Sequence, residues 1–157
     1  MTISGITTFL WFDSDAEEAA NFYVSLFPQS KLGSISYYPE GSLLPAGTVL
    51  TVDFEIFGKP FACLNGGPMF PHSEAVSFQV ACDTQDEVDY LWNALIADGG
   101  EESQCGWCKD KFGVSWQIIP KALTEALSSS DPTISEYAMQ AMMQMRKIII
   151  ADLTKPA

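Results

Sequence analysis

Basic residues are scarce in this chain. It has 8 Lys and Arg against 20 Asp and Glu, which gives a formal net charge of −12 at pH 7. Proteins that bind nucleic acid set clustered Lys and Arg against the phosphates, and anionic membrane surfaces attract the same side chains. The charge balance therefore excludes nucleic acid and membrane surfaces as partners, and it is typical of a protein kept in solution by its acidic surface.

Long apolar runs are also absent. The sequence has no stretch of about 18 apolar residues that could span a bilayer, and residues 1–12 lack a basic region followed by an apolar one, so we expect no signal peptide. Cysteines are few, and without an export signal they indicate reduced thiols in the cytoplasm. They are Cys63, Cys82, Cys105 and Cys108.

The chain nevertheless has ample material for a core. Hydrophobic residues make up 47% of its 157 residues and charged residues 18%, which is typical of a globular protein. This length predicts one domain, residues 1–157. Its organisation is a repeat in which a strand, a capped helix and three strands occur twice. We predict module one at about residues 3–67, module two at about 75–120, and a helical tail at about 121–157.

Helix starts mark the two copies. Ser14-x-x-Glu17 and Thr84-x-x-Glu87 both match the capping box, in which the hydroxyl accepts from the third backbone N–H and the Glu reaches back. In the tail, a helix is predicted to begin near Asp131. Its soft apolar stripe, which includes Met142, predicts a packing or dimer face, or alternatively a lid over a cavity. Together the elements predict an α+β fold.

Several motifs resemble those of a known family. They are residues 9–13, 16–19, 21–23, Phe27-Pro28, the turn at residues 64–68, Cys105-Gly106-Trp107 and residues 109–117. With these motifs the chain resembles the PhnB-like branch of the glyoxalase/bleomycin resistance/dioxygenase group, the vicinal oxygen chelate superfamily, often labelled demethylubiquinone methyltransferase-like. The resemblance covers the whole chain, the tail included. No Gly-rich strand–helix turn of the kind that binds nucleotide-like cofactors supports the methyltransferase label, and no cofactor is expected.

The resemblance implies two βαβββ modules whose curved sheets surround a cavity, and a homodimer, as in many members. Metal-using members place one His or carboxylate ligand on each of four strands. The corresponding positions here are Thr7 or Thr8, Cys63, Ala75 with Glu74 beside it, and Gln117. This set lacks the ligands that a divalent metal needs. We therefore predict no metal at the usual site.

A small-molecule pocket is the favoured site. Ser77, Gln79, Ser115 and Gln117 alternate along two strands that the fold would make neighbours, and a mainly apolar pocket with a few polar groups is typical of ligand sites. The alternative is a sheet face turned to solvent. The predicted ligand-binding residues are Phe9, Trp11, Asn65, Ser77, Gln79, Trp107, Ser115 and Gln117.

Candidates for catalysis are His72, Glu55 and Cys63. His72 is the single histidine and could act as acid or base near neutral pH, but a loop His is often only exposed or capping. Glu55 shares a strand face with Asp53, which suggests an acid/base pair or a solvated edge. Cys105-x-x-Cys108 has the spacing of a redox or zinc motif, although nothing helical follows it.

Two hypotheses from different classes follow. The first is a metal-free protein that binds a small molecule. The second is a lyase, isomerase or transferase that acts on a small metabolite through His72, Glu55 or Cys63. A dithiol redox protein that uses Cys105 and Cys108 is a third reading.

Overall fold

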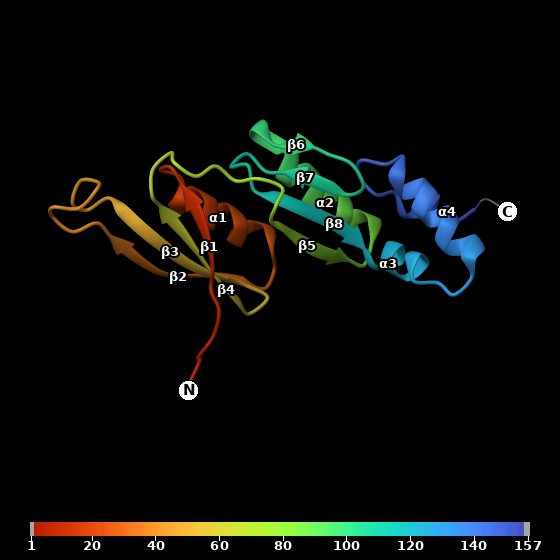
Figure 1. Cartoon of the computed structure of the whole chain (residues 1–157), viewed down its shortest axis with the longest axis horizontal. Helices are drawn as coiled ribbons and strands as arrows, with labels where there is room; N and C mark the ends of the chain where they lie inside the picture. The colour runs from red at the N-terminus through yellow and green to blue at the C-terminus, as the bar shows by residue number, and fades with distance from the viewer. Residues whose placement is uncertain (1, 156–157) are drawn as a thin grey trace. The chain divides into compact units, whose positions relative to one another are not determined.

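The computed structural model describes residues 2–155. The chain forms two compact units that divide between Pro71 and His72, here called module one and module two. Each repeats the order strand, helix, three strands, and module two continues into the C-terminal helices (Figure 1).

Module one holds a four-stranded sheet in the order β1-β4-β3-β2. Its elements are β1 (Thr8–Phe12), α1 (Ala16–Leu26), β2 (Ser30–Tyr37), β3 (Val49–Ile56) and β4 (Lys59–Asn65). β1 and β4 pair in parallel, which places the first strand beside the last, and the other pairs are antiparallel. The helix is amphipathic, and its buried Tyr23 stacks on Phe54 of β3, with ring centroids 6.0 Å apart.

The start of α1 differs from the sequence prediction. The capping box at Ser14 is wrong, because the N-cap is Asp15 and no side chain of the cap makes the bond. Instead Asn65, at the end of β4, accepts from the Ala16 backbone N–H at 2.9 Å. A buried amide from a neighbouring strand thus satisfies a helix end that local residues leave open.

Module two holds the second four-stranded sheet, in the order β5-β8-β7-β6. Its elements are β5 (Ser77–Cys82), α2 (Gln85–Ile96), the short 3₁₀ turn η1 (Ala97–Gly99), β6 (Glu101–Glu102), β7 (Trp107–Lys109) and β8 (Ser115–Pro120). β5 and β8 pair in parallel, as β1 and β4 do in module one.

The second capping box is confirmed. The Thr84 hydroxyl accepts from the Glu87 backbone N–H at 3.2 Å, and the Glu87 carboxylate accepts from the Thr84 N–H at 3.2 Å. The buried side of α2, which includes Trp92, packs on the strands beneath it. On these strands Phe78 and Trp116 lie 5.4 Å apart between ring centroids.

The tail belongs to the same compact unit as module two. It consists of α3 (Lys121–Leu127), α4 (Pro132–Met143) and the 3₁₀ turn η2 (Ile150–Leu153). A buried cluster joins these elements to the end of β8 and contains Ile119, Leu123, Ile148 and Leu153. Met142 and Met145 pack against this cluster, so the predicted apolar stripe is a packing face inside module two.

The predicted α+β class, with two βαβββ modules and a helical tail, is confirmed. Within residues 2–155, every helix is too short or too polar to cross a bilayer.

Candidate functional site

A pocket of about 480 Å³ lies on the sheet of module two. Strand and loop residues form one wall, and α3, the turn after it and α4 form the other. The lining residues are Gln79, Cys105, Trp107, Gln117, Ile119, Leu123, Thr124, Leu127, Ser128 and Met142. Three predicted ligand-binding residues, Gln79, Trp107 and Gln117, thus border one hollow.

Strand register explains why these three residues meet. Gln117 of β8 is paired with Gln79 of β5 on one side and with Trp107 of β7 on the other. Side chains of paired residues point to the same face of a sheet, so all three project from the face opposite α2. The Gln117 Nε2 donates to the Ser77 Oγ at 2.8 Å, which holds the Gln117 amide in one orientation.

The other two predicted residues of this face do not line the pocket. Ser77 supports Gln117, as described, and is half-buried. Ser115 is only 1% exposed, and its Oγ has no hydrogen-bond partner within residues 2–155. Of the four polar residues predicted on this face, Gln79 and Gln117 therefore line the pocket directly, and Ser77 supports Gln117.

The two cysteines of the CxxC motif lie in different surroundings. Cys105 is half-buried and borders the pocket. Cys108 pairs with Trp116, on the face that packs beneath α2, and burial raises the pKa of its thiol to about 12. Because the thiolate is the reactive form, both the raised pKa and the burial of Cys108 disfavour its reaction at neutral pH. This arrangement argues against the dithiol redox reading.

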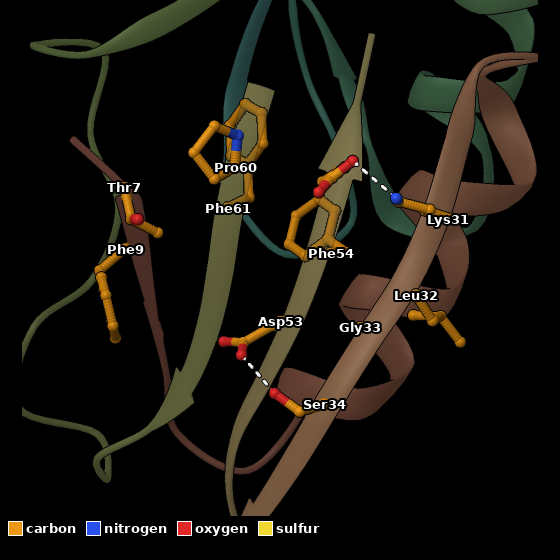
Figure 2. A pocket seen from close by; sticks show the side chains of 11 residues that line it. Thr7, Phe9, Lys31, Leu32, Gly33, Ser34, Asp53, Phe54, Pro60 and Phe61 are labelled. Atoms are coloured by element: carbon orange, nitrogen blue, oxygen red, sulfur yellow. Dashed lines mark hydrogen bonds and ion pairs between the residues drawn. The ribbon is translucent and has the colours of Figure 1, made fainter. Parts of the chain in front are cut away.

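Module one has a pocket of its own, of about 420 Å³. Figure 2 shows Asp53 turned towards Ser34, whose hydroxyl donates to the carboxylate at 2.6 Å. Lys31 forms an ion pair with Glu55 at 3.2 Å. Phe9 lies on β1 at the other side of this hollow and is 59% exposed. Charged side chains thus line this pocket, in contrast to the pocket of module two.

Trp11 and Asn65, predicted as ligand contacts, serve the fold of module one. The Trp11 Nε1 donates to the Gly67 carbonyl at 2.7 Å, and the indole lies edge-on to Phe70. A Cβ at Gly66 would overlap the indole, so only glycine fits there. The Asn65 side chain is buried, and besides capping α1 it donates to the Val49 carbonyl at 3.1 Å.

The catalytic candidates lie in different surroundings. Cys63 is fully buried on the face that packs beneath α1, because it pairs with Leu10 and Val52, both core residues. Glu55 is occupied by its ion pair with Lys31. His72 is half-buried at the start of module two. Glu55 and Cys63 therefore project from opposite faces of one sheet and do not form a catalytic pair.

Metal ligands do not gather in the part of the chain that the structure describes. No three or more His, Cys, Asp or Glu side chains there are placed to hold one ion. Glu74, which lies beside a usual ligand position, pairs instead with Lys109, and the hydrogen bond from this lysine lowers the pKa of the carboxyl. The prediction of a metal-free site stays a prediction.

Sequence reasoning missed the wall that the tail supplies. In the sequence, Leu123, Leu127 and Met142 resemble ordinary core positions of amphipathic helices. Their spacing predicts that they face the protein interior, but it does not indicate which element packs against them. The apolar stripe that includes Met142 was the signal in the sequence, but it was compatible with a packing face, a dimer face and a lid over a cavity.

Comparison with known proteins identifies the family. Residues 4–119 match the family model described as 3-demethylubiquinone-9 3-methyltransferase. The chain belongs to this family, and the predicted PhnB-like relationship is confirmed. We expected the resemblance to include the helical tail, but the match ends at residue 119, before the tail begins. No curated protein matches the chain.

Solved structures agree with this assignment. A PhnB protein from Bacillus cereus, titled a putative 3-demethylubiquinone-9 3-methyltransferase, is 38% identical, with a TM-score of 0.67, over 74% of this chain and 99% of its own. A protein from Pseudomonas aeruginosa is 20% identical, with a TM-score of 0.59, over 75% and 98%. The second likeness shows the shared fold alone.

Proposed function

We propose that this chain is a PhnB-like small-molecule-binding protein whose ligand lies in the pocket of module two, and that it binds without a metal ion. The observation that carries the proposal is the convergence of Gln79, Trp107 and Gln117 on one hollow of about 480 Å³. Pockets of this size, with apolar walls and a few placed polar groups, are typical of small-molecule sites. An aromatic face and two amides provide stacking and hydrogen bonding.

A methyl-transfer activity, as the family description words it, has no comparable support. The turns before α1 and α2 contain Asp13-Ser14-Asp15 and Asp83-Thr84, with no glycine. A nucleotide-like cofactor usually needs glycines there, so that the backbone can approach its phosphates or ribose closely. The enzyme alternative gains no support from Glu55 and Cys63, because these two residues project from opposite faces of one sheet.

Thermal-shift screening tests the proposal. The intact protein is scanned against a panel of aromatic and aliphatic metabolites, with and without divalent cations and a chelator. At about 100-fold above Kd, a ligand raises the melting temperature of a chain of this size by about 5–10 °C. We expect such a shift to survive chelation.

Matched variants locate the binding. Gln117→Leu should abolish the shift, whereas Gln140→Leu, the same change at an exposed position of α4, should preserve it. A shift that required a cation, or that persisted in Gln117→Leu, would overturn the proposal. The predicted homodimer, cytoplasmic location and shared cavity stay predictions, and light scattering after size exclusion tests the first.

A further inference from the structure

The C-terminal tail contributes half of the pocket wall in module two. Five lining residues come from α3, the turn after it and α4, namely Leu123, Thr124, Leu127, Ser128 and Met142. We infer that this tail-built wall selects an uncharged, mainly apolar ring compound that carries a hydrogen-bonding group. This inference rests on the proposed function and names the ligand class of the same site.

Backbone hydrogen bonds fix the tail to module two. The Cys105 N–H donates to the Met145 carbonyl at 2.8 Å, and the Gly106 N–H donates to the Arg146 carbonyl at 2.7 Å. These bonds attach the segment after α4 to the strand-side wall of the pocket. Backbone hydrogen bonds therefore connect the strand side of the pocket to the tail.

A glutamine on α2 clamps the next part of the tail. The Gln85 Nε2 donates to the Ile148 carbonyl at 3.1 Å, and its Oε1 accepts from the Ile150 N–H at 2.8 Å. One side chain thus satisfies two main-chain groups, as a neighbouring strand would. With Ile148 fully buried in the core cluster, the tail is a preformed wall, and a preformed site loses little entropy when a ligand binds.

The lining of this pocket defines the ligand's charge. None of its residues is Asp, Glu, Lys, Arg or His, although the chain has 20 Asp and Glu and 8 Lys and Arg. An ion bound in such surroundings would lose part of its hydration without gaining a partner of opposite charge. An uncharged ligand avoids this cost.

Polar groups on the lining define where the ligand hydrogen-bonds. The amides of Gln79 and Gln117 border the hollow from the sheet, and the hydroxyls of Thr124 and Ser128 border it from the tail. Because Ser77 takes one N–H of Gln117, the orientation of that amide is set before a ligand arrives. Trp107 offers an indole against which a ring can stack.

The wall lies outside the family relationship. The family model ends at residue 119, before α3 begins, and the Bacillus cereus protein aligns over 99% of its length with only 74% of this chain. The tail-built wall therefore lies beyond the part of the chain that the family match covers.

Two fluorescent probes that differ in charge test the ligand class. N-phenylnaphthylamine is uncharged, with two ring systems and one N–H, and anilinonaphthalene sulfonate has the same body with an added anion. We expect the uncharged probe to bind the intact protein at least about tenfold more tightly in a fluorescence titration. Equal or tighter binding of the sulfonate, or no binding of either probe, would overturn the inference.

Neighbouring methionines on α4 provide matched variants. Met142 lines the pocket, whereas Met143 is 61% exposed. Met142→Trp should fill the pocket and weaken the uncharged probe about tenfold or more, and Met143→Trp should change it less than about twofold. If Met142→Trp does not fold by circular dichroism, Thr124→Trp at the exposed pocket rim serves instead. Equal effects of the paired variants would overturn the tail's role.

Cys105 supplies an independent readout. It borders the pocket, whereas the other three cysteines are buried. The uncharged probe at saturation should slow modification of Cys105 by N-ethylmaleimide about tenfold, as followed by peptide mass spectrometry. An unchanged rate would overturn the placement of the probe. The proposed function is judged separately, because its decisive variant, Gln117→Leu, alters the sheet-side wall, whereas the probe pair and Met142→Trp test ligand charge and the tail-side wall.

Discussion

Module one and module two start equivalent helices and close equivalent hairpins by different means. α2 is capped by residues of its own first turn, Thr84 and Glu87, whereas α1 is capped by Asn65, 49 positions away. The β3–β4 hairpin turns at Gly58, whose φ is +73°, so this turn depends on a backbone conformation that glycine adopts easily. The β7–β8 hairpin also has a glycine at positive φ, Gly113 at +84°, but it is held in addition by the buried carboxylate of Asp110, which accepts from backbone N–H groups of the turn. The same order of elements can therefore be stabilised at equivalent helix starts and hairpins either by neighbouring residues or by residues far away in the sequence.

The open faces of the two sheets differ as well. Charged residues and the exposed ring of Phe9 border the pocket of module one. In module two, the tail covers the end of β8, where Ile119 is only 8% exposed, and the pocket beside it has no charged lining. The added helices, and not the shared βαβββ order, thus distinguish the two pockets.

The largest expected effect tests the hairpins. The Asp110 carboxylate accepts from the Phe112 and Val114 N–H groups at 2.9 and 3.1 Å and from the Trp116 indole at 2.9 Å. Asp110→Ala should reduce the free energy of unfolding by about 3–5 kcal/mol, since it leaves buried donors unsatisfied. Urea titration followed by circular dichroism measures this loss.

Gly58→Ala is the matched change in the module one hairpin. It should cost only about 1–2 kcal/mol, because it strains one residue at positive φ without orphaning a polar group. A loss for Asp110→Ala no larger than that for Gly58→Ala would show that both hairpins depend on backbone conformation alone.

The second prediction compares the helix caps. Asn65→Ala removes a buried acceptor for the Ala16 N–H and a donor to the Val49 carbonyl, so it should cost about 2–4 kcal/mol. Thr84→Ala removes one exposed cap and should cost about 1 kcal/mol. Urea titrations of the two variants give the difference. Similar losses would refute the distinction between long-range and local capping.

A third, smaller effect concerns the tail. Gln85→Ala removes both side-chain bonds to the Ile148 and Ile150 backbone, and we expect a loss of about 1–2 kcal/mol. Hydrogen exchange should accelerate at the Ile150 amide, whereas amides of module one should exchange as before. Unchanged exchange at Ile150 would show that the core cluster alone holds the tail.

The smallest effect depends on pH. Hydrogen bonds from Lys147 and then Gln85 lower the pKa of Asp89 below 3.8, its usual value. A carboxyl with a lowered folded-state pKa stabilises the protein above its unfolded-state pKa, and this stabilisation is lost as pH falls through the folded-state value. Asp89→Asn should therefore reduce the melting temperature by less than about 2 °C at neutral pH.

Melting curves across pH check this sign. The difference between Asp89→Asn and the unaltered protein should shrink steadily as pH falls below 3.8. A difference that stayed constant down to acid pH would show that charge on Asp89 contributes nothing to holding the tail.

Part of the site was predictable from alternation along the strands. Gln79 and Gln117 were predicted to share a face because side chains two positions apart on a strand point the same way, and because the fold that the family resemblance implies makes their two strands neighbours. Their register confirms this, and it adds Trp107 at the same level. Phe9 and Trp11 were predicted to lie beside this polar face, yet Trp11 is held against Gly67 and Phe70, because the expected fold gives a neighbourhood but not a contact.

The sequence by itself determined the order of elements, the repeat and the cap at Thr84, since periodicity, turn residues and a capping box act over a few neighbouring positions. Only the tertiary structure decided that Asn65 caps α1, that Cys108 lies in the core while Cys105 borders a pocket, and that Met142 completes its wall. Contacts of this kind join residues far apart in the chain. A local sequence pattern is compatible with many distant contact residues, and the packing of the whole fold selects among them.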